Sequence, residues 1–377
     1  MNVHESDKMR QSLSRVGFAE AEEVNCDSAD IIIFNTCCVR NTAESKIQNH
    51  IAVAGKTKRP GQIFAVVGCM PQQSERGKTL AKQYRFIDIV LGTHNISRIA
   101  QAVTECIAST KRTVEILEGR TDPEDFDELQ HTIDDKSNTH YVNITYGCEN
   151  FCTYCIVPYV RGRLICRPST EIFAEFKSVV SRVKQIRKDG DTHIIYLLGQ
   201  NVNSYECGEQ GADFAALLEG LCYLVDVDYI RVNFLSSHPR DFGDRLIRVI
   251  AENPQIERNI HLPIQSGCDR ILKMMNRGYT VAGYREKVDK LRAAVPDVRI
   301  TTDVICGFPT ETEEEFQITV ETMQSIRFNA AFIFPYSRRS GTVADKMEGH
   351  LDRRTKKARA TRLIALQKKI SLELAGQ

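Results

Sequence analysis

Three cysteines near the middle of the chain are spaced so that they could hold an inorganic centre. Cys148, Cys152 and Cys155 form a C-x3-C-x2-C arrangement directly after a strand-like run. A structural zinc site usually has four protein ligands, and bacterial ferredoxins use C-x2-C-x2-C-x3-C, so neither pattern matches. A [4Fe–4S] cluster held by three cysteines keeps one iron open to an exchangeable ligand, as a catalytic cluster requires. We therefore predict such a cluster at this loop.

The remaining cysteines do not indicate a disulfide framework. The chain has 13 cysteines, an odd number, and a reducing compartment would not sustain a set of disulfides. Four of them are scattered along the sequence, and we expect these to be buried side chains without chemistry: Cys26, Cys106, Cys207 and Cys222.

Composition is that of a globular protein without a membrane span. The chain is 42% hydrophobic and 26% charged, and no run approaches the ~18 apolar residues of a membrane helix. Charges throughout the first twenty residues argue against a signal peptide there. The formal net charge is only +1, so any contact with nucleic acid must come from a local patch. We expect a cytoplasmic protein with no membrane contact.

The first hundred residues have the pattern of a small parallel α/β domain, which we place at 1–106. Apolar runs at 30–36, 62–69 and 87–93 alternate with helix-like segments. A helix-like segment begins almost at Met1 where a first strand would be expected, so we interpret the N-terminus as cut. Residues 107–137 are acidic and turn-rich, and we expect them to form an interdomain linker.

Six further strand-like runs, separated by helical segments, predict a parallel barrel or part of one over residues 138–350. They lie at 141–145, 192–198, 229–235, 259–264, 298–305 and 330–335. Active residues of such a barrel are expected at the C-terminal ends of its strands. The predicted fold class is therefore α/β, with a small parallel N-terminal domain followed by a partial (β/α)6 barrel. A basic helix over 351–377 ends the sequence, and we expect one face of it to be buried through Leu363, Ile364, Leu366 and Ile370.

The cysteine loop, with Tyr154 beside its last cysteine, resembles the cluster loop of radical S-adenosylmethionine (SAM) enzymes. More closely, YGCENFCTYCIVPYVRGR is similar to the tRNA methylthiotransferases, most of all those that act on N6-isopentenyladenosine at position 37. The similarity covers the whole chain and continues through LGQNVNSY, SSHPRDF, HLPIQSG, MNRGYT, DVICGFPTETEEEF and YSRRSGT. The barrel is accordingly expected to be a radical SAM core.

This resemblance implies a reaction. The open iron would bind the amino and carboxylate groups of SAM, and one electron donated from the cluster would split the C–S bond of SAM. The resulting 5′-deoxyadenosyl radical would abstract hydrogen from adenine C2, and sulfur insertion and methylation would follow. Candidate SAM contacts are Tyr154, Gln200, Asn201 and Asn203, although an Asn-rich turn can also serve only its own backbone. Candidate contacts to the RNA substrate or to the SAM carboxylate are Arg161, Arg163 and Arg167.

The resemblance also implies an auxiliary [4Fe–4S] cluster in the N-terminal domain, held by three further cysteines. Cys37 in NTCCVRNTAESK and Cys69 in VVGCM match two of them. The third belongs to a GCQMN-like sequence, and this chain begins at the MN, so that ligand is missing here. Cys38 is a conceivable substitute, but neighbours on an extended segment point to opposite sides. We therefore expect Cys37 and Cys69 as ligands.

The same resemblance implies two macromolecular partners. They are a tRNA anticodon loop, whose unpaired adenine can be splayed into a pocket, and a flavodoxin-like or ferredoxin-like electron donor. The family's C-terminal RNA-binding β-barrel would begin where the sequence stops. The basic residues at 353–369 are either a solvated flank or a surface for tRNA phosphates. We expect a monomer.

Alternatives remain at three points. FPYSRRSGT is more similar to sister enzymes acting on N6-threonylcarbamoyladenosine-37 or on a ribosomal-protein aspartate, whereas GQNVNSY and SSHP favour the isopentenyl enzyme. A fragment that binds a cluster and RNA, or cleaves SAM without inserting sulfur, is a different class. His238 and His261 are as well explained by solvation or core packing as by substrate contact.

Gly307 and Pro309 should bend the chain, with Thr310 capping a helix that begins at Glu311.

Overall fold

The computed structural model describes residues 2–21, 28–38, 41–73, 76–109, 111–117, 137–207 and 212–376. Cys26, the side chain of Cys207 and residues 118–136 of the expected linker lie outside the described residues. The chain divides into two compact units, one made of Met1–Thr132 with Ile156–Arg163 and the other of Ile133–Cys155 with Leu164–Gln377. None of the helices in the described part of the chain is both long and apolar enough to span a membrane.

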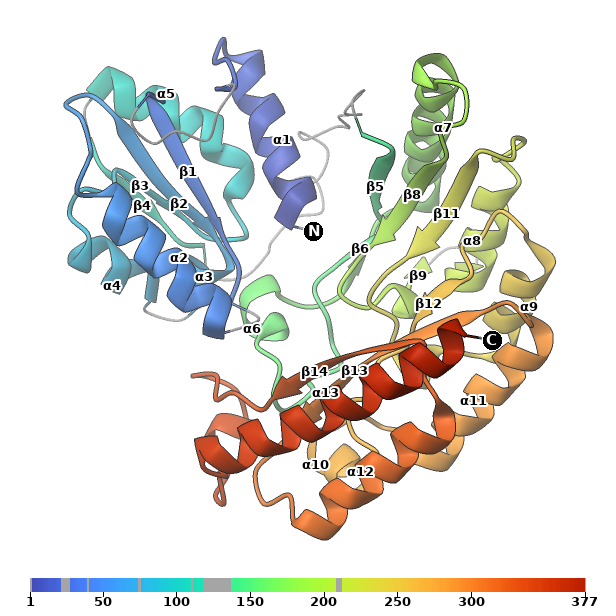
Figure 1. Ribbon diagram of the computed structural model, residues 1–377. Coiled ribbons are helices and arrows are strands. Elements are labelled where there is room, and N and C mark those ends of the chain that lie inside the picture. Colours follow the sequence, from blue (N-terminus) through green and yellow to red (C-terminus); the bar gives the residue numbers. More distant parts are fainter. Residues whose placement is uncertain are drawn as a thin grey trace. The chain divides into compact units, whose positions relative to one another are not determined.

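The first unit is built on a four-stranded parallel sheet in the order β1-β2-β3-β4 (Figure 1). Its strands are β1 (Ile31–Thr36), β2 (Ile63–Gly68), β3 (Ile89–Leu91) and β4 (Thr113–Glu115). The prediction of a small parallel α/β domain is thus confirmed. The expectation that 107–137 is only a linker is wrong at its start, because Thr113–Glu115 pairs with β3 and extends the sheet.

Helices cover both faces of this sheet. The side chains of Ala65 and Val67 pack with α1 (Asn2–Arg15) and α5 (Ile99–Ser109). Val66, which alternates with them, packs on the opposite face with α2 (Asn41–Ala54) and α4 (Arg76–Gln83). Two short helices complete the unit: α3 (Cys69–Gln72) directly after β2, and α6 (Val157–Arg161). Cys106 is buried in α5, as expected.

The second unit contains the six predicted parallel strands. They form two three-stranded sheets, β11-β8-β5 and β12-β13-β14, with a parallel bridge between Val232 and Ile256 leading from one toward the other. The strands are β5 (Thr139–Asn143), β8 (His193–Leu198), β11 (Ile230–Phe234), β12 (Asn259–His261), β13 (Arg299–Cys306) and β14 (Ala330–Pro335). This confirms the partial barrel. Short antiparallel pairs are β6 (Thr145–Tyr146) with β7 (Ile165–Cys166), and β9 (Glu206–Cys207) with β10 (Ala212–Asp213).

One face of these strands carries the main hydrophobic core. In β13 the buried residues Ile300, Val304 and Cys306 alternate with the partly exposed Thr301 and Asp303, so the opposite face is open. The surrounding helices are α7 (Ser169–Ile186), α8 (Phe214–Cys222), α9 (Asp244–Glu252), α10 (Asp269–Met274), α11 (Val281–Ala294), α12 (Glu313–Ile326) and α13 (Arg353–Ala375) (Figure 1). Cys222, at the end of α8, is buried as expected.

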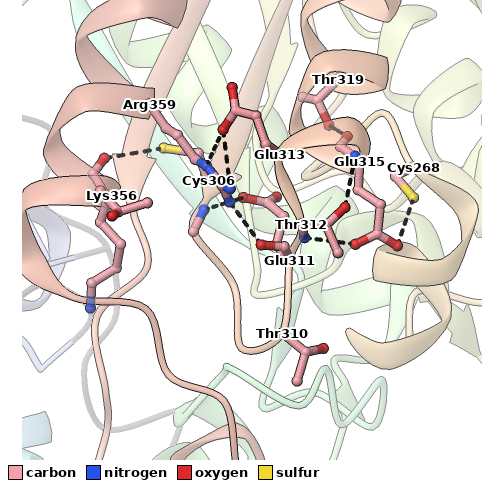
Figure 2. Close-up of polar contacts among 12 residues, drawn as sticks. Cys268, Cys306, Thr310, Glu311, Thr312, Glu313, Glu315, Thr319, Lys356 and Arg359 are labelled. Atoms are coloured by element: carbon pink, nitrogen blue, oxygen red, sulfur yellow. Dashed lines mark hydrogen bonds and ion pairs between the residues drawn. The ribbon is translucent and has the colours of Figure 1, made fainter.

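Helix α13 is held by a buried ion pair that the sequence pattern did not predict. Leu363 and Ile370 are buried as expected, but Ile364 is 53% exposed, which corrects the predicted apolar face. Arg359 is buried instead, and its Nη1 donates to Glu311 Oε2 at 2.7 Å (Figure 2). Arg359 cannot serve as a free phosphate ligand.

The turn before α12 differs in detail from the expectation. Gly307 has a φ of +73° and its N–H donates to Glu311 Oε2 at 2.6 Å, so the glycine bend is confirmed. Thr310, however, has a φ of +61° and does not cap the helix. The helix begins at Glu313, and Thr312 is its N-cap in a reciprocal capping box with Glu315 (Figure 2).

We expect Thr312→Ala to lower the free energy of unfolding by about 1 kcal/mol, because the first turn of α12 loses its capping oxygen. Thr310→Ala is the comparison variant: it removes an exposed hydrogen bond from Arg270 and no helix cap, so it should cost less than Thr312→Ala. Urea unfolding of both variants measures this. A larger effect at Thr310 than at Thr312 would contradict the capping assignment.

Candidate active site

The cysteine loop connects β6 to the segment that enters α6. Cys148 and Cys152 are buried, Cys155 is half-buried, and none of the three is in a disulfide. Gly147 and Phe151 have φ angles of +71° and +44°, so the backbone turns sharply on both sides of Glu149. A non-glycine residue held at positive φ stores strain, and such residues concentrate at functional sites.

A turn from another part of the second unit holds this loop. The backbone N–H of Thr153 donates to Met275 O at 3.1 Å. Asn276 Nδ2 donates to the carbonyls of Asn150 and Phe151 at 3.1 and 3.2 Å. Asn276 itself has a φ of +58°, a conformation that asparagine tolerates better than most residues. The MNRGYT motif, matched in the sequence without an assigned role, thus fixes the course of the cysteine loop.

Replacing Asn276 by glycine tests this support. Glycine keeps the left-handed backbone but removes both side-chain hydrogen bonds, so we expect a loss of about 1–2 kcal/mol. Amide hydrogen exchange in the loop should become faster, and the exposed Lys273→Ala variant in the same segment should leave it unchanged. Unaltered exchange in Asn276→Gly would show that the loop does not depend on these contacts.

A buried guanidinium lies against the central cysteine. Arg277 is 5% exposed, and its Nη1 donates to Cys152 Sγ at 3.2 Å. Its Nη2 donates to Pro263 O at 3.3 Å and its Nε to Tyr279 Oη at 3.0 Å. Sequence reasoning missed this residue. The only sequence signal for Arg277 was its charge within the MNRGYT motif.

A cavity of about 590 Å³ opens beside Cys148. Asn201 and Asn203, two of the predicted SAM contacts, line it, whereas Tyr154 packs in an apolar cluster with Ile271 and Tyr336. Gln200 is partly exposed after β8. The complete lining is Cys148, Glu149, Asn150, Leu164, Asn201, Asn203, Ser204, Tyr205, Glu206, Asp213, Arg240 and Asp241.

Asp241 organises the polar wall of this cavity. Its carboxylate accepts hydrogen bonds from Asn201 Nδ2 and Ser204 Oγ, both at 2.8 Å, and from Arg240 Nε at 2.8 Å. Burial alone would raise the pKa of Asp241, but the hydrogen bonds from Arg240, Asn201 and Ser204 lower it. Arg240 also donates to Asn150 Oδ1 at 2.6 Å, so the same network reaches the cysteine loop.

Several buried polar atoms at this edge have no hydrogen-bond partner among the residues that the structure describes. They include Asn201 Oδ1 and Asn203 Nδ2 in the cavity wall, and Ser237 Oγ and His238 Nε2 after β11. An unsatisfied buried polar atom costs roughly 1–3 kcal/mol, so such a group indicates a site for ligand or water atoms. Burial and the charge of Arg277 lower the pKa of His238 to about 3, so its ring is neutral. His261 bonds Thr301 Oγ1 at 2.9 Å.

The cysteine loop offers the thiol donors of the predicted cluster. Among the described residues, no three His, Cys, Asp or Glu side chains are gathered closely enough to hold one metal ion. A four-iron cluster spreads its thiolates further apart than one ion does, and the loop offers three thiols, none of them in a disulfide, beside a buried cation. Burial raises the pKa of the Cys148 thiol, so the thiolate that binds iron would form only as the metal displaces its proton. The residues present therefore fit the predicted group.

In the first unit the structure brings Cys38 and Cys69 together. Both are buried, and Ile156, just before α6, and Val160 of α6 pack against them; Cys37, the residue before Cys38, is half-buried. A hydrogen bond with the Cys38 thiol lowers the pKa of Cys69 to about 7, with burial opposing and Arg161 assisting. The structure therefore places Cys38, which the sequence argument had set aside, next to Cys69 just beyond the end of β1 at Thr36.

The three candidate arginines have different environments. Arg161 is buried and forms a two-fold hydrogen bond with Glu5, at 2.6 and 3.2 Å, so the expectation that it meets RNA or SAM is wrong. Arg167 donates to Asn143 O at 2.7 Å and pairs with Glu175, so it supports β5 and does not reach outward. Only Arg163, of these three, is exposed.

Comparison with known proteins identifies the class. The Radical SAM superfamily profile matches residues 142–323, and that of the Uncharacterized protein family UPF0004 matches residues 1–92. Fold and site thus define a radical SAM enzyme. A tRNA-2-methylthio-N(6)-dimethylallyladenosine synthase from Fusobacterium nucleatum is 44% identical over 98% of this chain and 82% of its own. One from Thermoanaerobacter pseudethanolicus is 41% identical over 100% and 78%. The chain belongs to this family of radical SAM methylthiotransferases.

Solved structures support the fold alone. The radical SAM methyltransferase TsrM from Kitasatospora setae has a TM-score of 0.63 at 13% identity, covering 90% of this chain and 73% of its own. The cobalamin-dependent radical SAM enzyme OxsB has a TM-score of 0.61 at 11% identity, covering 97% of this chain and 54% of its own.

Proposed function

We propose that this chain is a tRNA methylthiotransferase that converts N6-isopentenyladenosine-37 to its 2-methylthio derivative. The reaction would remove hydrogen from adenine C2, insert sulfur there and methylate the sulfur. The observation that carries the proposal is the three-cysteine loop beside a cavity with unpartnered polar atoms. The 44% identity to a synthase named for this product supports the choice of substrate.

Cys148, Cys152 and Cys155 would hold the [4Fe–4S] cluster, and the cavity beside Cys148 would take SAM. When bound, the cluster and SAM supply the electron and the carbon radical that remove hydrogen from an unactivated carbon. The protein supplies binding, orientation and exclusion of water. Gln200 and Tyr154 stay predicted SAM contacts.

The cavity wall offers complementary groups for an amino acid moiety. Asp241 accepts from the Asn201 amide, which leaves Asn201 Oδ1 as an acceptor for an ammonium group. Asn203 Oδ1 accepts from His238 N at 3.3 Å, which leaves Asn203 Nδ2 as a donor for a carboxylate or a ring nitrogen. These two amides are therefore fixed in orientation before SAM enters.

A second cluster in the first unit is part of the proposal. Cys37 and Cys69 would be ligands, and the contact between Cys38 and Cys69 makes Cys38 a further candidate. Such a cluster would supply or carry the sulfur. Iron and acid-labile sulfide measured after anaerobic reconstitution would read about eight irons per chain with both [4Fe–4S] clusters and about four with one.

The proposed macromolecular partners are a tRNA anticodon loop and a flavodoxin-like or ferredoxin-like reductant. Exposed basic residues available to phosphates are Arg163, Arg353, Arg354, Lys357, Lys368 and Lys369. Arg362 forms an ion pair with Glu313. We further propose a cytoplasmic monomer, with a methylthiotransferase N-terminal domain that extends through β4, a radical SAM core at 138–350 and a basic helix at 351–377.

The test is anaerobic incubation of the reconstituted protein with SAM, a reductant and tRNA, followed by mass analysis of the digested nucleosides. We expect 5′-deoxyadenosine and 2-methylthio-N6-isopentenyladenosine with tRNA carrying the isopentenyl group. Product only with threonylcarbamoyladenosine tRNA, or only with a ribosomal-protein aspartate, would favour a sister enzyme, to which FPYSRRSGT is similar. SAM cleavage without any methylthio product would support the abortive fragment.

A further inference from the structure

We propose that Arg277 is a positioning residue that raises the reduction potential of the cluster held by Cys148, Cys152 and Cys155. This inference rests on the proposed function, because it requires that the cysteine loop holds a cluster. It concerns a residue outside the cysteine loop itself and assigns it an electrostatic role. Three features of Arg277 support this role: its fixed geometry, its burial and the absence of a carboxylate partner among the described residues.

Arg277 is fixed in place by its own hydrogen bonds. Nη2 and Nε donate to Pro263 O and Tyr279 Oη, at 3.3 and 3.0 Å, and this leaves Nη1 directed at Cys152 Sγ at 3.2 Å. Tyr279 is held in turn, because its hydroxyl donates to Ile264 O at 2.8 Å. The N–H donor at Cys152 is therefore preorganised and does not need to be recruited when the cluster binds.

The positive charge of Arg277 has no carboxylate beside it. The side chain is 5% exposed, and in the part of the chain that the structure describes no Asp or Glu forms an ion pair with it. A buried charge without a counter-ion is unfavourable, and buried cations are normally paired. Of the groups that accept from Arg277, only the Cys152 thiol becomes an anion when it binds iron. The thiolate-ligated cluster is thus the counter-ion that this arginine lacks.

This arrangement affects the reduced cluster more than the oxidised one. Reduction adds one electron to the cluster, supplied by the external reductant, and so adds one negative charge. A fixed cation and an N–H donor at a ligating sulfur stabilise the more negative state. Potentials of such clusters depend on hydrogen bonds to sulfur, net charge and solvent exposure. Removing Arg277 should therefore make the cluster harder to reduce.

The experiment is an EPR-monitored redox titration with dithionite, with iron and sulfide measured on the same samples. All proteins carry Cys37→Ala and Cys69→Ala so that one cluster is observed. In Arg277→Met we expect about four irons per chain, as in the parent. The equilibrium constant for reduction should fall about tenfold, a midpoint shift of about 59 mV to more negative potential.

Arg270→Met is the matched control. Arg270 lies on α10, just before the MNRGYT turn, but it is exposed and paired with Glu315, so its removal should leave the midpoint unchanged. If Arg277→Met does not retain iron, the midpoint potential of Arg277→Lys tests the proposal instead. Lysine keeps the charge but not the planar fork, so we expect a smaller shift in the same direction.

The experiment distinguishes a failure of the proposed function from a failure of the role proposed for Arg277. A parent protein that binds no iron would remove the basis of the proposed function itself. A parent that binds about four irons, with an Arg277 variant that retains them at an unchanged midpoint, would overturn only the role of Arg277. A shift of equal size in Arg270→Met would also overturn it, because the effect would then be a general one of net charge.

Discussion

Replacing Cys148, Cys152 and Cys155 together by alanine is expected to remove about four irons per chain and to reduce SAM cleavage to background. The loop offers no other thiol, and an alanine cannot ligate iron. The loss should be all-or-none, because the radical chemistry depends on the cofactor and the protein supplies only its setting. Iron and sulfide analysis after anaerobic reconstitution, with chromatography of 5′-deoxyadenosine, measures both effects.

Cys222→Ala is the matched control for this variant. Cys222 is also a buried thiol of the second unit, but it lies in the core at the end of α8 and does not line the cavity. It should retain full iron and full SAM cleavage. Unchanged iron in the triple variant would contradict the cluster assignment, and no iron in either protein would contradict the radical SAM function of this chain.

The second large effect is expected at the buried ion pair between Arg359 and Glu311. Arg359→Met should lower the free energy of unfolding by about 3–5 kcal/mol, the usual result of leaving one buried charge unpaired. The side chains are 6% and 1% exposed, and Glu311 also accepts from the Gly307 N–H. Denaturant unfolding at neutral pH measures the loss.

The pH dependence of this variant has a definite sign. Burial raises the pKa of Glu311, and Arg359 and the Gly307 N–H oppose the rise. Without Arg359, the pKa of Glu311 in the folded protein rises further above its value in the unfolded chain. Lowering the pH then protonates Glu311 in the folded protein and removes the cost of its unpaired charge, so the folded state becomes more stable. The destabilisation should thus be smaller at pH 5 than at pH 8.

Arg362→Met is the control on the same helix. Arg362 pairs with Glu313, but both side chains are about half exposed, so its loss should cost less than about 1 kcal/mol. Arg359 and Arg362 both lie over the Phe316 ring, which keeps their aromatic contacts comparable. Equal losses in the two variants would show that burial of the Glu311–Arg359 pair is not what stabilises α13.

Much of the fold was predictable because it follows from local patterns. Strands β1, β2 and β3 and the six strands of the second unit lie within or beside the apolar runs, since buried parallel strands are nearly continuous in apolar residues. Strand β4 was missed because its three residues, Thr-Val-Glu, are too few and too polar to form such a run. Thr312 and Thr310 differ by two positions, and only the backbone angles decide which one caps α12.

The three cysteines of the candidate cluster could be identified from the amino-acid sequence alone. The spacing of Cys148, Cys152 and Cys155 is a local property, and the strand before them predicts that they lie at the edge of a sheet. Asn201 and Asn203 were found in the same way, after β8. Local spacing does not show which group each charged side chain pairs with in the folded protein.

Those partners were decided only by the tertiary structure. Arg277 donates to a cysteine 125 positions away, and Arg161, expected at the substrate, pairs with Glu5 across 156 positions. The physical reason is that a buried charge must find a counter-group wherever the fold brings one within hydrogen-bonding distance. Sequence periodicity predicts which face of an element is buried, whereas the choice of ion-pair partner depends on how distant elements pack against that face.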